Sequence, residues 1–125
     1  MFQLEVANRI VAVPNTKQYG RLSLFSQFHS NPSLEFRIPK TSFFPIPKVE
    51  SALVKFQKNF KNCDEYNSVL FQDIIKKSFQ GRRKMIKNTL AGYDFSSEVK
   101  NSIDFTRRPE TISPEEFALL TKSIL

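Results

Sequence analysis

Apolar residues recur at helical spacing near the amino terminus of the chain. Over residues 4–13 they fall at positions i, i+4 and i+7, which predicts a helix that stops at Pro14. This apolar face consists of Val6, Ile10 and Val13. Residues 21–29 are apolar on most sides, which predicts a second, short helix that is buried all round. The polar triplet 31–33 is typical of a turn.

Alternation of apolar and polar residues then predicts two short strands. Residues 34–38 and 50–57 each place their apolar side chains on one face, as a half-buried strand does. The segment FFPIPK at 43–48 has too many prolines for a sheet ladder and predicts an extended loop. The two strands are expected to pair antiparallel across this loop, and a long loop between strands is often functional.

The rest of the chain has the pattern of a helical bundle. Residues 58–67 are polar and predict a linker. Two apolar stripes follow, one over 70–79 and one over 85–90 with the basic residues of 82–87 around it. A short helix capped by Ser96 is expected over 96–102.

The last helix has the clearest start signal. Ser113 stands at the position of an N-cap, Pro114 in the first turn and Glu116 three residues after the cap, which is the pattern of a capping box. Together these elements predict an α+β chain with two parts. Residues 1–58 hold helices and strands that cannot close a sheet alone, and residues 59–125 form a small all-helical unit.

Charge adds a possible partner to this picture. The formal net charge is +7, and a block of six basic residues contains no acidic one. The block consists of Lys76, Lys77, Arg82, Arg83, Lys84 and Lys87. Excess positive charge favours a polyanionic partner, usually nucleic acid. A solvated charged face is the alternative, and charge alone does not separate the two.

Several kinds of chemistry have no residues to support them. His29 has no Cys near it and is expected to pack or to cap a helix, and the scattered acidic residues predict no metal site. Three glycines are too few for a loop that cradles a cofactor or a phosphate. No apolar stretch approaches the roughly 20 residues of a membrane helix, and no signal peptide is visible. We therefore expect a cytoplasmic protein without membrane contact, with Cys63 as a free thiol.

The proline-rich loop is the most informative segment. Pro45 and Pro47 fix the backbone and remove N–H groups, so the loop is expected to be stiff. Phe43 and Phe44 precede this frame, and a rigidly held ring can stack on a base drawn out of its helix. The alternative, which composition alone favours, is that both rings are buried beneath the loop.

The order of these segments resembles the ribosomal RNA adenine dimethyltransferases, the KsgA family. Residues 43–51, FFPIPKVES, match the family signature F-x-P-x-P-K-V-[DE]-S. Residues 82–90 resemble its basic helix, and residues 108–117 resemble the run into its last helix. Residues 1–10 and 19–23 resemble the segments that follow its catalytic motif. The Erm resistance methyltransferases share the first signature, whereas the basic helix and the last segment favour the KsgA type.

The resemblance implies the carboxy-terminal part of a Rossmann-like methyltransferase domain over 1–58 and a helical rRNA-binding domain over 59–125. By position, Phe43 would stack on the target adenine, Pro45 and Pro47 would hold the loop, and Lys48 would meet phosphate. The rRNA backbone would be gripped by the basic block: Lys76, Lys77, Arg82, Arg83, Lys84 and Lys87.

The implied reaction dimethylates two adjacent adenines near the 3′ end of small-subunit rRNA. S-adenosylmethionine would be the methyl donor of the complete enzyme, and we expect this chain to bind no cofactor, because the family's donor-binding half has no counterpart in it. Met1 corresponds to an internal position of the family, so the chain is expected to be part of a longer one. Two alternatives remain open: a non-catalytic rRNA-binding or ribosome-assembly module, and a fragment of an Erm-type large-subunit enzyme.

Overall fold

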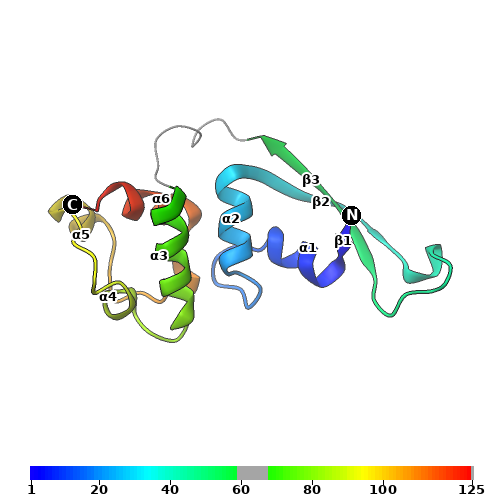
Figure 1. Ribbon diagram of the computed structural model, residues 1–125, viewed down its shortest axis with the longest axis horizontal. Helices are drawn as coiled ribbons and strands as arrows, with labels where there is room; N and C mark the ends of the chain where they lie inside the picture. The colour runs from blue at the N-terminus through cyan, green and yellow to red at the C-terminus, as the bar shows by residue number, and fades with distance from the viewer. Residues whose placement is uncertain (59–67, 125) are drawn as a thin grey trace.

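The computed structural model describes residues 1–58 and 68–124. A small sheet occupies one side of the molecule and a group of helices occupies the other (Figure 1). Most of the predicted linker, and Cys63 with it, lies outside the described residues. Within the described ranges, no helix is long and apolar enough to cross a membrane.

Three strands form the sheet in the order β1–β3–β2, and both neighbouring pairs are antiparallel. They are β1 (Phe2–Gln3), β2 (Ser30–Ile38) and β3 (Ser51–Lys58). The antiparallel pairing predicted for the two longer strands is confirmed. The sequence pattern does not predict β1, because two residues are too few to show alternation.

Strand β2 starts earlier and is less buried than its pattern predicts. The turn predicted over residues 31–33 is wrong, because all three residues pair with β3. Pro32 is tolerated there because β2 lies at the edge of the sheet, where a missing N–H breaks no ladder. The register shifts between Leu34 and Phe36, and a shift of this kind re-aims the next side chain. Phe36 is therefore 55% exposed instead of buried.

Helix α1 (Leu4–Ile10) is shorter than the predicted 4–13. Its last turn does not form because the residue before a proline is disfavoured in the helical conformation, and Val13 precedes Pro14. Val13 is 59% exposed while Ala12 is buried, so the predicted apolar face is wrong at its last member.

Four helices follow residue 67, as the sequence predicts. They are α3 (Ser68–Gln80), α4 (Ile86–Thr89), α5 (Ser97–Ser102) and α6 (Pro114–Lys122). A short 3-10 helix, η3 (Pro109–Thr111), lies before α6. The expected α+β organisation is therefore confirmed, with a three-stranded sheet beside a small group of helices.

The basic helix predicted over residues 82–90 is wrong for its first half. Residues 81–84 form a turn, and α4 starts only at Ile86. A Cβ atom added at Gly81 would lie 2.9 Å from Thr89 Cγ2, so the chain folds closely back on itself where α3 ends. Three basic side chains therefore project from a turn instead of a helix: Arg82, Arg83 and Lys84.

Helix α2 (Arg21–His29) lies between the sheet and the other helices (Figure 1). Leu24 and Phe28 are buried, but Phe25 is 45% exposed, so burial on all sides is wrong. The helix has an open side because its neighbours α1, β2, α3 and α6 do not surround it. The expected packing role of His29 is confirmed, since its ring lies edge-on to Phe25 and Phe28.

The molecule has two hydrophobic cores. The smaller one joins α1 to β3 through Ala7, Ile10, Ala52 and Val54. The larger one draws its buried residues from 12–28 as well as from 71–120. At its centre the rings of Phe28 and Phe71 lie 4.1 Å apart, which packs α2 directly against α3. Helix α2 therefore belongs to the larger core together with the helices that follow residue 67.

The capping box predicted for α6 is confirmed. The Ser113 hydroxyl accepts from the Glu116 N–H at 3.2 Å, and a Glu116 carboxylate oxygen accepts from the Ser113 N–H at 3.1 Å. The Arg107 guanidinium also donates to this carboxylate at 2.5 Å. Partial burial raises the pKa of Glu116, but the hydrogen bonds from Arg107 and Ser113 outweigh it and hold that pKa below its usual value. The cap expected from Ser96 is wrong, because its side chain makes no capping hydrogen bond to α5.

Replacing Glu116 with Gln should lower the free energy of unfolding by about 1.5 kcal/mol near neutral pH, because charged hydrogen bonds are lost. Because the pKa of Glu116 is lowered in the folded state, its ionised carboxylate stabilises the fold at pH values above the usual glutamate pKa. This contribution disappears as the pH falls through the lowered pKa. Urea denaturation at about pH 7 and about pH 2 measures the difference. Glu115→Gln, at the exposed neighbouring position, is the control and should change little at either pH. A Glu116→Gln effect that is equal at both pH values would contradict the prediction.

Candidate nucleic-acid interface

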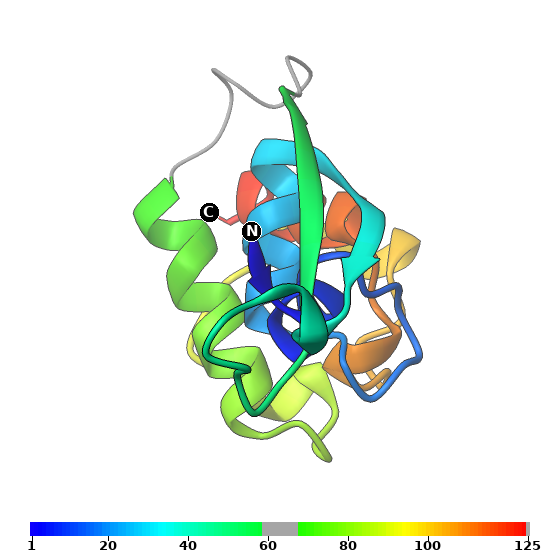
Figure 2. The ribbon, with the colours of Figure 1, turned by 90° about the vertical axis from the view of Figure 1, so that its right-hand side faces the viewer.

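The loop between β2 and β3 extends away from the sheet at the end of the molecule opposite the helices (Figure 1). Figure 2 shows the same loop facing the viewer in front of the sheet. It starts with a 3-10 turn, η1 (Lys40–Ser42), whose Lys40 carbonyl accepts from the Phe43 N–H at 3.3 Å. It returns at Glu50, whose carbonyl accepts from the Leu4 N–H at 2.9 Å. The loop is therefore anchored to the start of α1 where it returns, and a 3-10 turn shapes its beginning.

The two rings of this loop have different surroundings. Phe43 is half-buried, whereas Phe44 is 100% exposed. The expectation that both rings are buried is therefore wrong for Phe44. Phe43 has an extended backbone, in which successive side chains point to opposite sides, so two neighbouring rings do not share the same surroundings.

The other predicted loop residues surround these rings. Pro47 is half-buried, while Pro45 and Lys48 are exposed. Lys40 is exposed at the start of the loop, and the sequence has no acidic residue from Phe36 to Val49. The loop thus presents aromatic rings between positive charges.

The basic block divides into two groups. Lys76, Arg83, Lys84 and Lys87 are exposed and reach solvent. Lys77 instead makes an ion pair with Asp73 at 3.3 Å and lies 4.7 Å above the ring of Tyr93. Its ammonium also contacts the Tyr93 hydroxyl at 3.3 Å. Lys77 therefore has a structural contact that ties α3 to the segment after α4.

Arg82 joins three segments of the chain. Its guanidinium donates to the carbonyls of Thr16 and Lys17 at 3.1 and 3.0 Å. The same group lies 3.5 Å from a Glu110 carboxylate oxygen. Nearby, the Asn15 N–H donates to the Glu110 carbonyl at 2.8 Å. The turn after α3, the loop before α2 and η3 are thereby held together.

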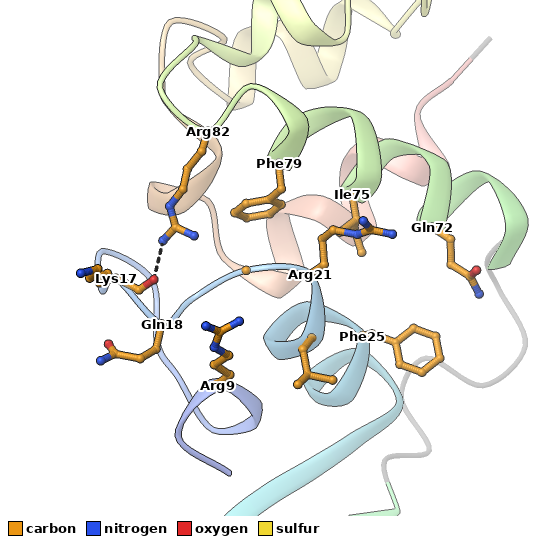
Figure 3. A pocket seen from close by; sticks show the side chains of 11 residues that line it. Arg9, Lys17, Gln18, Arg21, Phe25, Gln72, Ile75, Phe79 and Arg82 are labelled. Atoms are coloured by element: carbon orange, nitrogen blue, oxygen red, sulfur yellow. Dashed lines mark hydrogen bonds between the residues drawn. The ribbon is translucent and has the colours of Figure 1, made fainter. Parts of the chain in front are cut away.

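These contacts form one wall of a cleft between α3 and the loop before α2 (Figure 3). The cleft has a volume of about 630 Å³ and none of its lining residues is acidic. Four of them are cationic: Arg9, Lys17, Arg21 and Arg82. Phe25, Phe79 and Ile75 provide apolar surface beside these charges. A positive cleft with apolar walls suits a polyanion that carries flat bases.

Sequence reasoning missed Arg9, Lys17 and Arg21. Arg9 makes an ion pair with Glu5 at 3.0 Å, whereas the side chains of Lys17 and Arg21 have no ion pair or hydrogen bond to other described residues. No linear signal marks these residues, because single basic residues among polar ones form no motif, and they line a cleft only where their segment faces α3. The structure also keeps the proline-rich loop apart from α3 and the turn after it, which carry most of the basic block and lie in the opposite half of the molecule (Figure 1).

Arg82→Ala should therefore lower the free energy of unfolding by about 2 kcal/mol, the usual effect of losing hydrogen bonds from a charged group. Arg83→Ala, at the exposed neighbouring position, should change stability by less than about 0.5 kcal/mol. In an RNA-binding titration at several salt concentrations, Arg83→Ala should reduce the slope of log affinity against log salt by about 1. Equal stability of the two variants would contradict the role of Arg82, and an unchanged slope would contradict that of Arg83.

The glycines of the chain stand apart from one another. Its three glycines lie before α2, after α3 and after α4, and none forms a glycine-rich turn behind a strand. The described residues also contain no group of acidic, His or Cys side chains placed to hold a metal ion.

Two solved structures have the same arrangement of elements. A dimethyladenosine transferase from Plasmodium falciparum superposes with a TM-score of 0.81 at 19% identity, over 95% of this chain and 53% of that one. The 23S rRNA methyltransferase ErmE gives a TM-score of 0.61 at 18% identity, over 96% of this chain and 51% of that one. The fold is that of the corresponding part of these methyltransferases.

The sequence comparison is more specific. The Ribosomal RNA adenine dimethylase family model matches residues 1–124, and the chain belongs to this family. A relative named Ribosomal RNA small subunit methyltransferase A, from Blochmanniella floridana, is 42% identical over 97% of this chain and 46% of its own length. A relative of the same name from Caldanaerobacter subterraneus is 38% identical, over 99% and 49%. The chain thus spans about half the length of the curated relatives it matches.

Proposed function

We propose that this chain is part of an S-adenosylmethionine-dependent rRNA adenine N6,N6-dimethyltransferase. The substrate would be two adjacent adenines near the 3′ end of small-subunit rRNA, in the cytoplasm, during ribosome assembly. The family match over residues 1–124 is the observation that carries the proposal. It includes the F-x-P-x-P-K-V signature, which lies on the anchored loop with its Phe44 ring exposed.

In this proposal Phe43 holds the target adenine. A base inside a stacked helix is inaccessible to a methyl donor, so the enzyme must draw it out and support it. The half-buried Phe43 ring provides a flat apolar surface for this base, and Pro45 and Pro47 keep that surface in place. S-adenosylmethionine, held by another part of the complete enzyme, would supply the methyl group. Lys48 is exposed on this loop and would meet a phosphate of the same RNA strand.

The basic surface would bind the rRNA backbone. Residues 1–58 would complete the methyltransferase domain, and residues 59–125 would supply most of the rRNA contacts, with α2 packed against both. Lys76, Arg83, Lys84 and Lys87 are exposed and suited to phosphate contacts. The cleft lined by Lys17 and Arg21 extends this positive surface towards α1. Binding of this kind releases counterions and weakens steeply with added salt.

A hybrid enzyme tests the proposal. It joins residues 1–125 to the amino-terminal half of the Blochmanniella floridana relative, and is incubated with small ribosomal subunits that lack the modification. Dimethylation of two adjacent adenines near the 3′ end, mapped by mass spectrometry of RNA fragments, is the expected result. A folded hybrid, verified by circular dichroism, that binds the subunit but transfers no methyl group would contradict it.

The exposed basic surface also favours a second candidate, a non-catalytic module that binds rRNA during ribosome assembly. In that case the hybrid enzyme would bind small subunits with the same salt dependence and would not methylate them. Methylation of a single adenine in large-subunit rRNA would instead identify an Erm-type activity. The same methylation map therefore separates all three functions.

A further inference from the structure

Phe44 is the most exposed large apolar residue at the tip of the β2–β3 loop. Its side chain is 100% exposed, and two further apolar residues of the loop, Ile46 and Val49, are 62% and 49% exposed. Of these three side chains, only that of Phe44 is left wholly uncovered by the described parts of the chain. The family signature F-x-P-x-P leaves the position of Phe44 open, so family membership assigns no role to this ring.

The loop does not allow Phe44 to turn inward. Phe43, immediately before it, is sheltered and has an extended backbone, which directs the next side chain to the other side. Pro45, immediately after it, fixes its own φ angle and restricts the residue before it. The ring is therefore held in solvent on a stiff support.

The charge around the ring indicates what binds it. Lys40 and Lys48 are exposed on either side of the ring in sequence, and no acidic residue lies from Phe36 to Val49. Aromatic rings between cations are the usual arrangement for single-stranded nucleic acid, with the ring on a base and the cations on the backbone. Acidic residues, which would repel phosphates, are absent from this part of the loop.

We propose that Phe44 forms a second base-binding subsite, which stacks on the nucleobase next to the target adenine. The inference rests on the proposed function, because it requires an RNA whose target base is drawn out onto Phe43. Removing a base from a stack leaves its neighbour with one bare face, and apolar side chains are known to fill such gaps in nucleic acids. Phe43 and Phe44 point to opposite sides of the loop, so one ring serves the target and the other its neighbour.

The test uses the 125-residue chain and RNA hairpins that contain two adjacent adenines. In two separate RNAs, 2-aminopurine replaces the nucleotide on the 5′ or the 3′ side of the pair. At saturating protein, stacking on Phe44 should keep the fluorescence of one probe quenched, and Phe44→Ala should release it. Phe44→Ala should also weaken RNA binding about tenfold to a hundredfold, the usual range for one base–aromatic stack. Phe44→Trp should preserve both the quenching and the affinity.

Ile46→Ala is the matched control, because Ile46 is apolar, exposed and on the same loop. It should weaken binding less than about threefold and leave the fluorescence unchanged, because an aliphatic side chain offers no flat face on which a base can stack. If the wild-type chain binds the RNA and Phe44→Ala shows the same affinity and the same fluorescence, the second subsite is overturned and the proposed function stays intact. A wild-type chain with no salt-dependent RNA binding overturns both. Loss of association with a separately expressed amino-terminal half, at unchanged RNA affinity, would make Phe44 a protein contact and overturn the subsite.

Discussion

Phe43→Ala is expected to lower methylation by the hybrid enzyme about a hundredfold while RNA binding falls less than about fivefold. The ring would support only the base that has left its helix. Its loss therefore affects the position of the reacting base more than the affinity of the enzyme for RNA. Stacking of one base on an aromatic ring contributes about 1–3 kcal/mol, and misplacement of a reacting group by a small distance can cost a factor of about 100. Single-turnover methylation and filter binding measure the two effects separately.

Phe36→Ala is the control for this experiment. Phe36 is also an aromatic residue near the start of the loop, but it lies on β2 with 55% of its side chain exposed. Its removal should change neither methylation nor binding by more than about twofold. Equal losses of methylation and binding in Phe43→Ala would instead indicate a ring that only shapes the loop. Phe43→Tyr should retain most of the activity, because it keeps the flat surface.

Phe28→Ala is expected to lower the free energy of unfolding by about 3–5 kcal/mol, the usual effect of deleting a buried phenylalanine side chain. Phe28 is 1% exposed, and its ring lies 4.1 Å from that of Phe71 in the larger core. A loss of this size is a large fraction of the stability of a small domain. Urea denaturation followed by circular dichroism measures it, since the helices of the larger core should unfold together.

Phe25→Ala provides the comparison on the same helix. Phe25 is 45% exposed and lines the cleft, so its removal should cost less than about 1 kcal/mol. If the two variants unfold at the same urea concentration, α2 does not stabilise the larger core. If the Phe28 variant alone is strongly destabilised, residues 59–125 need α2 for a complete core.

Local sequence signals predicted the elements that depend on neighbouring residues. The capping box of Ser113 and Glu116 forms as expected, because its groups are three residues apart on one turn. The stripe over 70–79 predicted α3, and alternation predicted the pairing of β2 with β3. The family resemblance is also carried by the sequence and is confirmed by the match over residues 1–124.

Burial was predicted less well, because it depends on which elements meet. Phe25, Phe36 and Phe44 are apolar residues that the sequence pattern places in the interior, yet each is largely exposed. In each case the local pattern shows that the side chain is apolar, but it does not show whether another element packs against it. The bulge in β2 and the open side of α2 arise from packing, which a periodic pattern does not contain.

The sequence by itself determined most of the elements, the family and the segments that carry its signature, because these depend on short-range patterns of residue type. Only the tertiary structure decided which charges are available to a ligand. Lys77 and Arg82 belong to the same basic block as Arg83, but the fold brings Lys77 against Tyr93 and ties Arg82 to Glu110 and the loop before α2. The cleft of Arg9, Lys17 and Arg21 likewise exists only because this segment meets α3, which is distant in the chain and supplies the opposite wall with Ile75 and Phe79.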